Sequence, residues 1–213
     1  MNKKVITIVI IVAVLIILGA GTFLFLNRGG SVGIDKSLQN ENNKQSAGNV
    51  DLGDKKVLVV YFSETGNTGK LAKLISDEVG GDFRRIETVK PYPTGQELFD
   101  YTKNERDEDA RPELKDLDVN MDDYDIIFVG YPIWWYTLPM PLYTFFDEYD
   151  FSGKTIVPFN THEDSGNGGT YSTIKEWEKD ATVLDGLAIR GGDMTNDQTT
   201  RIRNWLKGLD LSE

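Results

Sequence analysis

Residues 56–75, KVLVVYFSETGNTGKLAKLI, decide the fold of this chain. They begin with a continuously apolar run, which is typical of a strand covered on both faces, and they end in the apolar spacing of a helix. The turn between strand and helix is rich in hydroxyl groups and contains Gly66 and Asn67. Because backbone N–H groups at the start of a helix point at an anion, this combination predicts a phosphate-binding site.

The turn contains no Lys or Arg, and it carries one acid, Glu64. The ATP-binding pattern G-x-x-x-x-G-K-[ST] is excluded, because Glu64 replaces its first Gly and Leu71 replaces its final Ser or Thr. No G-x-G-x-x-G follows the strand, which disfavours a dinucleotide site. We therefore expect neutral donors to hold the phosphate: backbone N–H groups, the helix dipole, and the hydroxyls of Ser63, Thr65 and Thr68.

The side chain of Glu64 is expected to point to solvent, because turning it toward a bound anion would bring like charges together in a poorly screened site. A helix cap rich in Ser and Thr, with no ligand, is the alternative explanation of the turn.

The composition excludes several classes of function. The 213 residues carry 23 Lys and Arg against 34 Asp and Glu, a formal net charge of -11, so no nucleic-acid partner is expected. The chain has no Cys, which excludes disulfides and thiolate metal ligands, and it has one His. The sequence contains no metal-ligand spacing and no recognisable Ser–His–Asp triad, so we predict no metal site and no catalytic residues.

Residues 1–28 are predicted to form an N-terminal transmembrane signal-anchor. Residues 5–26 carry no charge, and a helix of that length, at about 1.5 Å per residue, spans a hydrocarbon core of about 30 Å. Lys3 and Lys4 precede the apolar run. The positive-inside bias then predicts a single-pass protein of the cell membrane with its domain on the extracytoplasmic side. The alternative is a signal peptide cleaved near residues 19–21, Gly-Ala-Gly.

Residues 29–54 are rich in Gly, Ser, Asn and Gln, and are predicted to be a disordered polar linker. In residues 55–213, apolar strand-like runs alternate with amphipathic segments, which is typical of an α/β domain with helices on both faces of a parallel sheet. Ligands of such sheets bind at the carboxyl ends of the strands. A single last strand is expected near residues 182–189, and helices are expected at residues 67–79, 96–106, 141–149, 171–180 and 196–208.

Three motifs of this domain resemble those of the flavodoxin family: YFSETGNT at 61–68, GYPIWW at 130–135 and GKTIVPF at 153–159. The resemblance covers nearly all of residues 55–213. It implies an open five-stranded parallel sheet of order 2-1-3-4-5, with helices on both faces, and FMN as the cofactor. It also implies that the FMN phosphate is held by Ser63, Thr65, Gly66, Asn67 and Thr68.

The second motif follows the third apolar strand and continues as GYPIWWYTLP, residues 130–139. Two adjacent Trp side chains in a loop indicate a flat ligand, so Trp134 is expected to face the flavin and to keep water off it. Pro132 fixes the approach of the loop, and the backbones of Ile133 and Trp134 are candidates for contact with flavin N5. For Trp135, packing on the next helix is the alternative, because adjacent residues of an extended loop point in opposite directions.

A third loop, NTHEDSGNGGTYS at 160–172, has small and polar residues that suit close backbone approach. The resemblance implies that this loop lines the pyrimidine end of the flavin. An acid beside the ring, Glu163 or Asp164, would lower the reduction potential, and a protonated His162 would raise it. A surface position is the alternative for His162. The cofactor contacts predicted from this loop are Thr161, His162, Glu163, Ser165, Gly166 and Gly168.

The sequence thus predicts a membrane-tethered, FMN-binding, flavodoxin-like electron-transfer protein whose partners are redox proteins. An NAD(P)H-dependent flavin or quinone reductase on the same fold is the alternative, because fold alone does not separate a carrier from an enzyme. No nicotinamide site is recognisable, which favours the carrier. A ligand-free interaction domain is a third hypothesis, which the three intact loop motifs disfavour.

Overall fold

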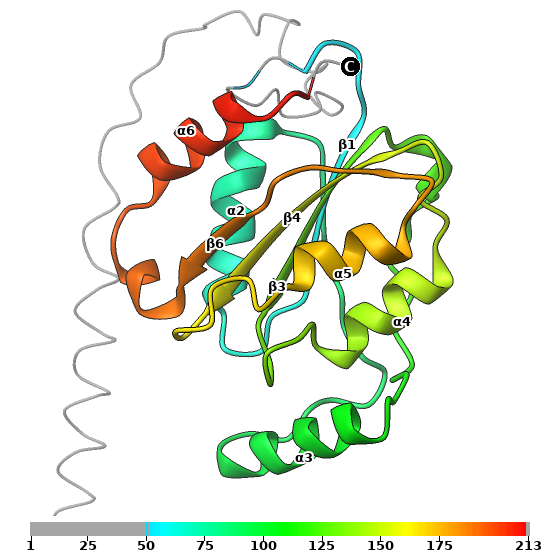
Figure 1. Cartoon of the computed structure of the whole chain (residues 1–213), viewed down its shortest axis with the longest axis vertical. Helices are drawn as coiled ribbons and strands as arrows, with labels where there is room; N and C mark the ends of the chain where they lie inside the picture. Colours follow the sequence, from blue (N-terminus) through cyan, green and yellow to red (C-terminus); the bar gives the residue numbers. More distant parts are fainter. Residues whose placement is uncertain (1–49, 51, 212–213) are drawn as a thin grey trace, which may run out of the picture. The chain divides into compact units, whose positions relative to one another are not determined.

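The computed structural model describes residue 50 and residues 52–211 (Figure 1). The predicted signal-anchor and most of the predicted linker lie outside these residues. Within the described part of the chain, no helix combines the length and the apolar character that crossing a membrane requires.

Six strands form one parallel sheet in the order β2-β1-β3-β4-β5, and β6 also pairs with β4. The predicted order 2-1-3-4-5 is confirmed. The central strands read as unbroken apolar runs because helices cover both of their faces. The bounds of the strands are β1 Val57–Tyr61, β2 Asp82–Arg85, β3 Ile126–Pro132, β4 Thr155–His162, β5 Thr182–Val183 and β6 Leu187–Arg190.

The edge of the sheet beside β4 is split into two short strands, whereas the sequence predicted one strand there. The last pair of β5 joins Val183 to Ile156, and the first pair of β6 joins Leu187 to Phe159. Between these two pairs the chain from β5 to β6 advances four residues, whereas β4 advances three. The edge segment therefore contains one extra residue, a bulge. The bulge lies opposite Pro158, which has no N–H to donate to a ladder.

Helices connect the strands as the apolar spacing predicted. The helix expected at residues 67–79 is confirmed with those bounds, and the others differ by a few residues. The last helix begins at Thr199 instead of residue 196, because the Asp197 carboxylate accepts the Thr199 N–H at 2.9 Å and holds the preceding residues in a turn. The described helices are α2 Asn67–Val79, α3 Gln96–Asp107, η2 Met121–Asp123, α4 Met140–Glu148, α5 Thr170–Trp177, η3 Gly191–Thr195 and α6 Thr199–Gly208.

Two hydrophobic cores lie on the two faces of the sheet. Val57 and Val59 of β1 face the core that α2 and α6 cover, and Leu58 and Val60 face the core that α4 and α5 cover. The two pairs of helices lie on opposite sides of the strands in Figure 1. The period of two along β1 therefore decides which helix each side chain meets.

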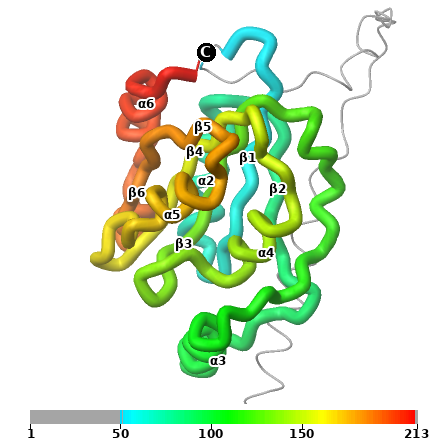
Figure 2. Tube along the Cα trace, turned by 45° about the vertical axis from the view of Figure 1, so that its right-hand side comes forward, coloured from blue at the N-terminus to red at the C-terminus, as the bar shows by residue number. Residues whose placement is uncertain are grey.

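Helix α3 is the exception, because it lies beyond the end of the sheet and covers neither face (Figures 1 and 2). It buries only Thr102 and Glu105 among its residues. Leu98 and Tyr101 of α3 are partly buried against the core that α4 and α5 cover, so the helix joins that core through these two side chains.

Candidate functional site

The turn after β1 is built around Gly66, which adopts φ 90° as the N-cap residue of α2. Ser63 is buried, and its Oγ accepts the Gly66 N–H at 3.2 Å. No side chain caps α2, although the first N–H groups of a helix have no partner inside the helix. The turn is therefore not a side-chain cap of α2, and uncapped N–H groups at the start of a helix suit a bound anion.

Two of the predicted contacts bind each other across the sheet. The hydroxyls of Thr68 and Thr161 form a buried hydrogen bond of 2.7 Å, which links the start of α2 to the end of β4. This bond brings the turn after β1, which is the predicted phosphate turn, and the loop after β4 into one site. It also means that the Thr68 hydroxyl has a partner before any ligand binds.

A cation lies beside the turn, although the turn itself has none. Arg85 pairs with Tyr61 in the sheet register, and its Nη2 donates to the carbonyl oxygen of Ser63 at 2.7 Å. The same Nη2 lies 3.7 Å from Glu64 Oε1, and the Glu64 side chain is 27% exposed. Burial raises the pKa of Glu64, and nearby Arg85 opposes that rise. Glu64 as a whole residue is exposed and does not line the cavity at the carboxyl ends of the strands, in keeping with the prediction that it points away from the anion site. Strand pairing also brings it a partner, Arg85 of β2, that the sequence did not show.

A cavity of about 290 Å³ opens at the carboxyl ends of β1, β3 and β4. Nine predicted contacts line it: Thr65, Asn67, Pro132, Ile133, Trp134, Trp135, Thr161, His162 and Glu163. The sequence missed four further lining residues: Leu98, Phe99, Thr102 and Gly191. Phe99 is 56% exposed in the structure, and the sequence signal that could have found it is a Phe within the largely polar segment 96–107.

The loop between β3 and α4, residues 133–139, is called the Trp loop here, and it closes one side of the cavity. Trp134 packs edge-on against Phe62, with ring centroids 5.3 Å apart, and against Tyr92, at 5.4 Å. The Trp135 indole N–H donates to Thr102 Oγ1 of α3 at 3.0 Å. Trp135 thus packs on the helix that precedes the loop in sequence and not on the next one.

The backbone of the Trp loop forms a tight two-residue turn. Trp134 and Thr137 exchange N–H···O bonds of 3.1 and 2.9 Å, and the residues between them, Trp135 and Tyr136, have φ 52° and 64°. Bulky residues rarely adopt positive φ, and each costs about 1–2 kcal/mol. The N–H of Ile133 donates to Thr161 O at 2.8 Å. The N–H groups of Ile133 and Trp134 and the carbonyl group of Trp134 are therefore engaged within the protein. Both residues nevertheless line the cavity.

Part of the third loop is scaffold instead of cavity lining. Gly166 adopts φ 61°, and its carbonyl accepts the Asn160 amide at 3.0 Å. Gly168 lies behind the Trp loop, where a Cβ would come within 3.1 Å of the Tyr136 carbonyl oxygen. The Ser165 carbonyl accepts the Gly168 N–H at 3.1 Å. These three predicted contacts shape the loop, and none of them lines the cavity.

Of the three ionisable residues at 162–164 in this loop, one faces solvent and two line the cavity. Asp164 is 85% exposed and lies 3.3 Å from Arg190 Nε, so it does not face the cavity as the sequence suggested. Glu163 and His162 do line the cavity. Among the described residues, His162 Nδ1 is the one buried side-chain nitrogen or oxygen that has no hydrogen-bond partner.

A family model described as flavodoxin matches residues 56–209 of this chain. The chain belongs to the flavodoxin family. It is 24% identical over 193 residues to a flavodoxin of Nostoc sp., a match that covers 73% of this chain and 95% of the relative.

Solved structures show the same flavodoxin fold. An inferred flavoprotein of Bacteroides eggerthii is 31% identical, with a TM-score of 0.62, over 72% of this chain and 97% of that one. A flavoprotein of Lactobacillus acidophilus, solved in complex with FMN, is 21% identical, with a TM-score of 0.56, over 71% of this chain and 99% of that one. The second similarity bears on the fold alone.

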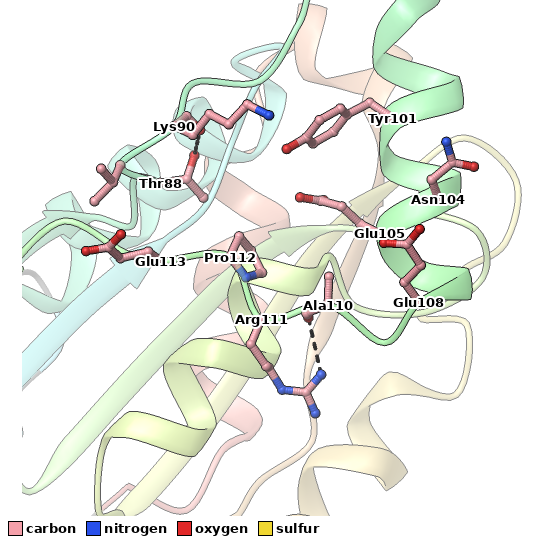
Figure 3. A pocket seen from close by; sticks show the side chains of 11 residues that line it. Thr88, Lys90, Tyr101, Asn104, Glu105, Glu108, Ala110, Arg111, Pro112 and Glu113 are labelled. Atoms are coloured by element: carbon pink, nitrogen blue, oxygen red, sulfur yellow. Dashed lines mark hydrogen bonds between the residues drawn. The ribbon is translucent and has the colours of Figure 1, made fainter.

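This flavodoxin-family domain has a second hollow, of about 490 Å³, on another side of α3. In Figure 3 the side chains of Tyr101 and Glu105 extend from α3 toward Lys90, and Arg111 points away from the hollow. The Tyr92 hydroxyl donates to Glu105 at 2.7 Å. Burial raises the pKa of Glu105, and that hydrogen bond opposes the rise. None of the predicted cofactor contacts lines this hollow.

Proposed function

We propose that this flavodoxin-family protein carries electrons on FMN and is tethered to a membrane, where it exchanges electrons with redox proteins. The observation that carries the proposal is the 290 Å³ cavity, which joins a hydroxyl-rich turn at the start of α2 to a loop of two Trp residues. A flavin with one phosphate needs both parts: donors for a dianion and flat apolar surfaces for a ring.

Two observations indicate that the residues present fit FMN. The unpartnered Nδ1 of His162 calls for a polar ligand atom, because a buried polar atom without a partner costs about 1–3 kcal/mol. At Gly191 a Cβ would lie 3.0 Å from Asn67 Nδ2 and 3.3 Å from Glu163 Oε1, so glycine keeps this part of the cavity open. A polar cavity kept open by glycine suits a cofactor better than a packed core.

The roles of the residues follow from their positions. Thr65 and Asn67 line the cavity and would bind the phosphate. Gly66 supplies the left-handed conformation of the turn, and the Ser63 hydroxyl stabilises it by accepting the Gly66 N–H. Trp134 would contact the ring and exclude water. When bound, FMN supplies the transfer of one or two electrons, and the protein supplies binding, orientation and electrostatics.

We expect the full chain, purified in detergent and reconstituted with FMN, to show no catalytic oxidation of NADH or NADPH above that of free FMN. A chemical reductant should reduce the bound flavin in two resolvable one-electron steps, which absorbance during stepwise titration would follow. Sustained turnover with either nicotinamide would contradict the carrier and establish the reductase instead.

The membrane tether is part of the proposal and rests on the uncharged residues 5–26 and the preceding Lys3 and Lys4. Protease added to intact cells without their wall is expected to cut within residues 29–54 and to release the domain. Immunoblotting of the supernatant measures this release. Cleavage that occurs only after lysis would reverse the orientation, and domain free in the medium without protease would indicate a cleaved signal peptide.

A further inference from the structure

The unpartnered Nδ1 of His162 is an exception within the described residues, because every other buried side-chain nitrogen or oxygen there has a hydrogen bond. Leaving such an atom unpaired costs about 1–3 kcal/mol. Folded proteins rarely retain this cost without a use for the atom. Because His162 also lines the 290 Å³ cavity, we expect Nδ1 to form its hydrogen bond with a ligand bound there.

The position of His162 at the end of β4 indicates which part of the ligand it meets. Successive side chains of a strand point to opposite faces of the sheet. Thr161 points toward α2, since its hydroxyl bonds Thr68 in the phosphate turn. The side chain of His162 therefore points away from that turn. On the same strand, Asn160 accepts a hydrogen bond from Tyr171 of α5, on the opposite face of the sheet from α2. Because side chains two residues apart share a face, the side chain of His162 also points to the face of α5.

His162 pairs with Arg190 of β6 in the sheet, and on its β3 side the cavity is lined by apolar residues that follow the partner of Thr161. Pro132 of β3 pairs with Thr161, and the Ile133 N–H donates to the Thr161 carbonyl at 2.8 Å. Pro132 and Ile133 line the cavity together with His162. These are apolar surfaces, which suit a flat heteroaromatic ring and not a phosphate.

We propose that His162 contacts the isoalloxazine ring of FMN through Nδ1 and is a specificity-determining residue that favours the reduced cofactor. The inference rests on the proposed function, namely that the site binds a flavin. The polar edge of an isoalloxazine presents mostly acceptors, so the imidazole bears its proton on Nδ1 and donates it in a hydrogen bond. A hydrogen bond strengthens as its acceptor gains negative charge. The same bond therefore stabilises reduced FMN more than oxidised FMN.

Two substitutions of similar size distinguish the role of Nδ1 from that of Nε2. His162→Asn keeps a polar group near the position of Nδ1, and His162→Gln keeps one near the position of Nε2. His162→Leu removes both. The full chain and these three variants would be titrated with FMN and with riboflavin, and the potential of the bound FMN would be measured against a reference dye.

We expect His162→Leu and His162→Gln to weaken oxidised FMN and riboflavin alike, by about tenfold, and His162→Asn to lose at most about threefold. Reduced FMN should lose about a further tenfold in the Leu and Gln variants. For a two-electron couple, that factor corresponds to a potential lower by about 30 mV.

Three results would overturn the inference. A loss for FMN without a loss for riboflavin would place His162 on the phosphate. Unchanged affinities and potentials in all three variants would show that water satisfies Nδ1, and equal behaviour of the Asn and Gln variants would refute the assignment to Nδ1. Should the Leu variant fail to fold, the Asn and Gln pair still decides. Failure of the wild-type chain to bind any flavin would instead refute the proposed function itself.

Discussion

Replacing Thr65 and Asn67 together by Ala is expected to weaken FMN about a hundredfold, with less than about a threefold loss for riboflavin. Each side chain donates to a charged phosphate in this account, and a hydrogen bond to a charged group contributes about 1.5–3 kcal/mol. Neither side chain forms a hydrogen bond in the described structure, so the change should leave the fold intact. Fluorescence titration of the two flavins measures both affinities.

Riboflavin is the control ligand in that experiment, because it has the same ring and lacks the phosphate. Thr68→Val gives the contrasting variant, since it breaks the buried bond to Thr161 and should lower stability as well as affinity. Equal losses for FMN and riboflavin in the double variant would mean that the turn after β1 does not hold phosphate.

Gly81→Ala is expected to lower the free energy of unfolding by about 2–5 kcal/mol. Gly81 adopts φ 83°, and a Cβ there would lie 2.3 Å from the Val57 carbonyl oxygen and 2.8 Å from the Val57 Cβ. Left-handed backbone strain costs about 1–2 kcal/mol for a residue with a Cβ. The overlap with the backbone of β1 adds about 1–3 kcal/mol, because no side chain can turn aside to relieve it.

Gly153→Ala is the matched control for this prediction. Gly153 adopts φ 73°, and a Cβ there would meet nothing within 4 Å. The Gly153→Ala variant should therefore lose only the strain, about 1–2 kcal/mol. Urea denaturation of both variants, followed by circular dichroism, measures the difference. Equal losses would show that the chain around β1 yields without cost and that Gly81 is retained for its conformation alone.

The sequence predicted those elements whose pattern depends on local residues. Residues 67–79 have apolar positions at helical spacing and follow a glycine, and this pattern predicted a helix with those bounds. The structure confirms them, since α2 is Asn67–Val79. The unbroken apolar run of β1 predicted a strand covered on both faces. The order of the strands came from the resemblance to a family and not from periodicity, because pairing order depends on contacts between distant residues.

The features that the sequence missed depend on such distant contacts. Arg85 reaches the phosphate turn because β2 pairs with β1, and nothing near Ser63 in the sequence shows this. Phe99 lines the cavity because α3 folds across the end of the sheet, although α3 is a largely polar helix. The break between β5 and β6 lies opposite Pro158 of another strand. Each is a tertiary effect that no local pattern contains.

The third loop shows which of its predicted contacts the sequence pattern can place at the cavity. Its small residues were predicted to touch the cofactor, and of these Gly166 and Gly168 adopt positive φ and do not line the cavity. Only Thr161, His162 and Glu163 of the predicted set line the cavity from this loop. Glycine in such a loop indicates a backbone that turns sharply, and this requirement resembles the requirement for close approach to a ligand.

The measurement that tests the account most directly is the affinity of the wild-type full chain for FMN compared with riboflavin. A site that joins a phosphate turn to a ring surface predicts that FMN binds at least about a hundredfold more tightly, because two or more bonds to the phosphate contribute about 1.5–3 kcal/mol each. It also predicts that flavin fluorescence is quenched on binding, since Trp134 and Trp135 line the cavity. Equal affinity for the two flavins, or no binding of either, would contradict the account.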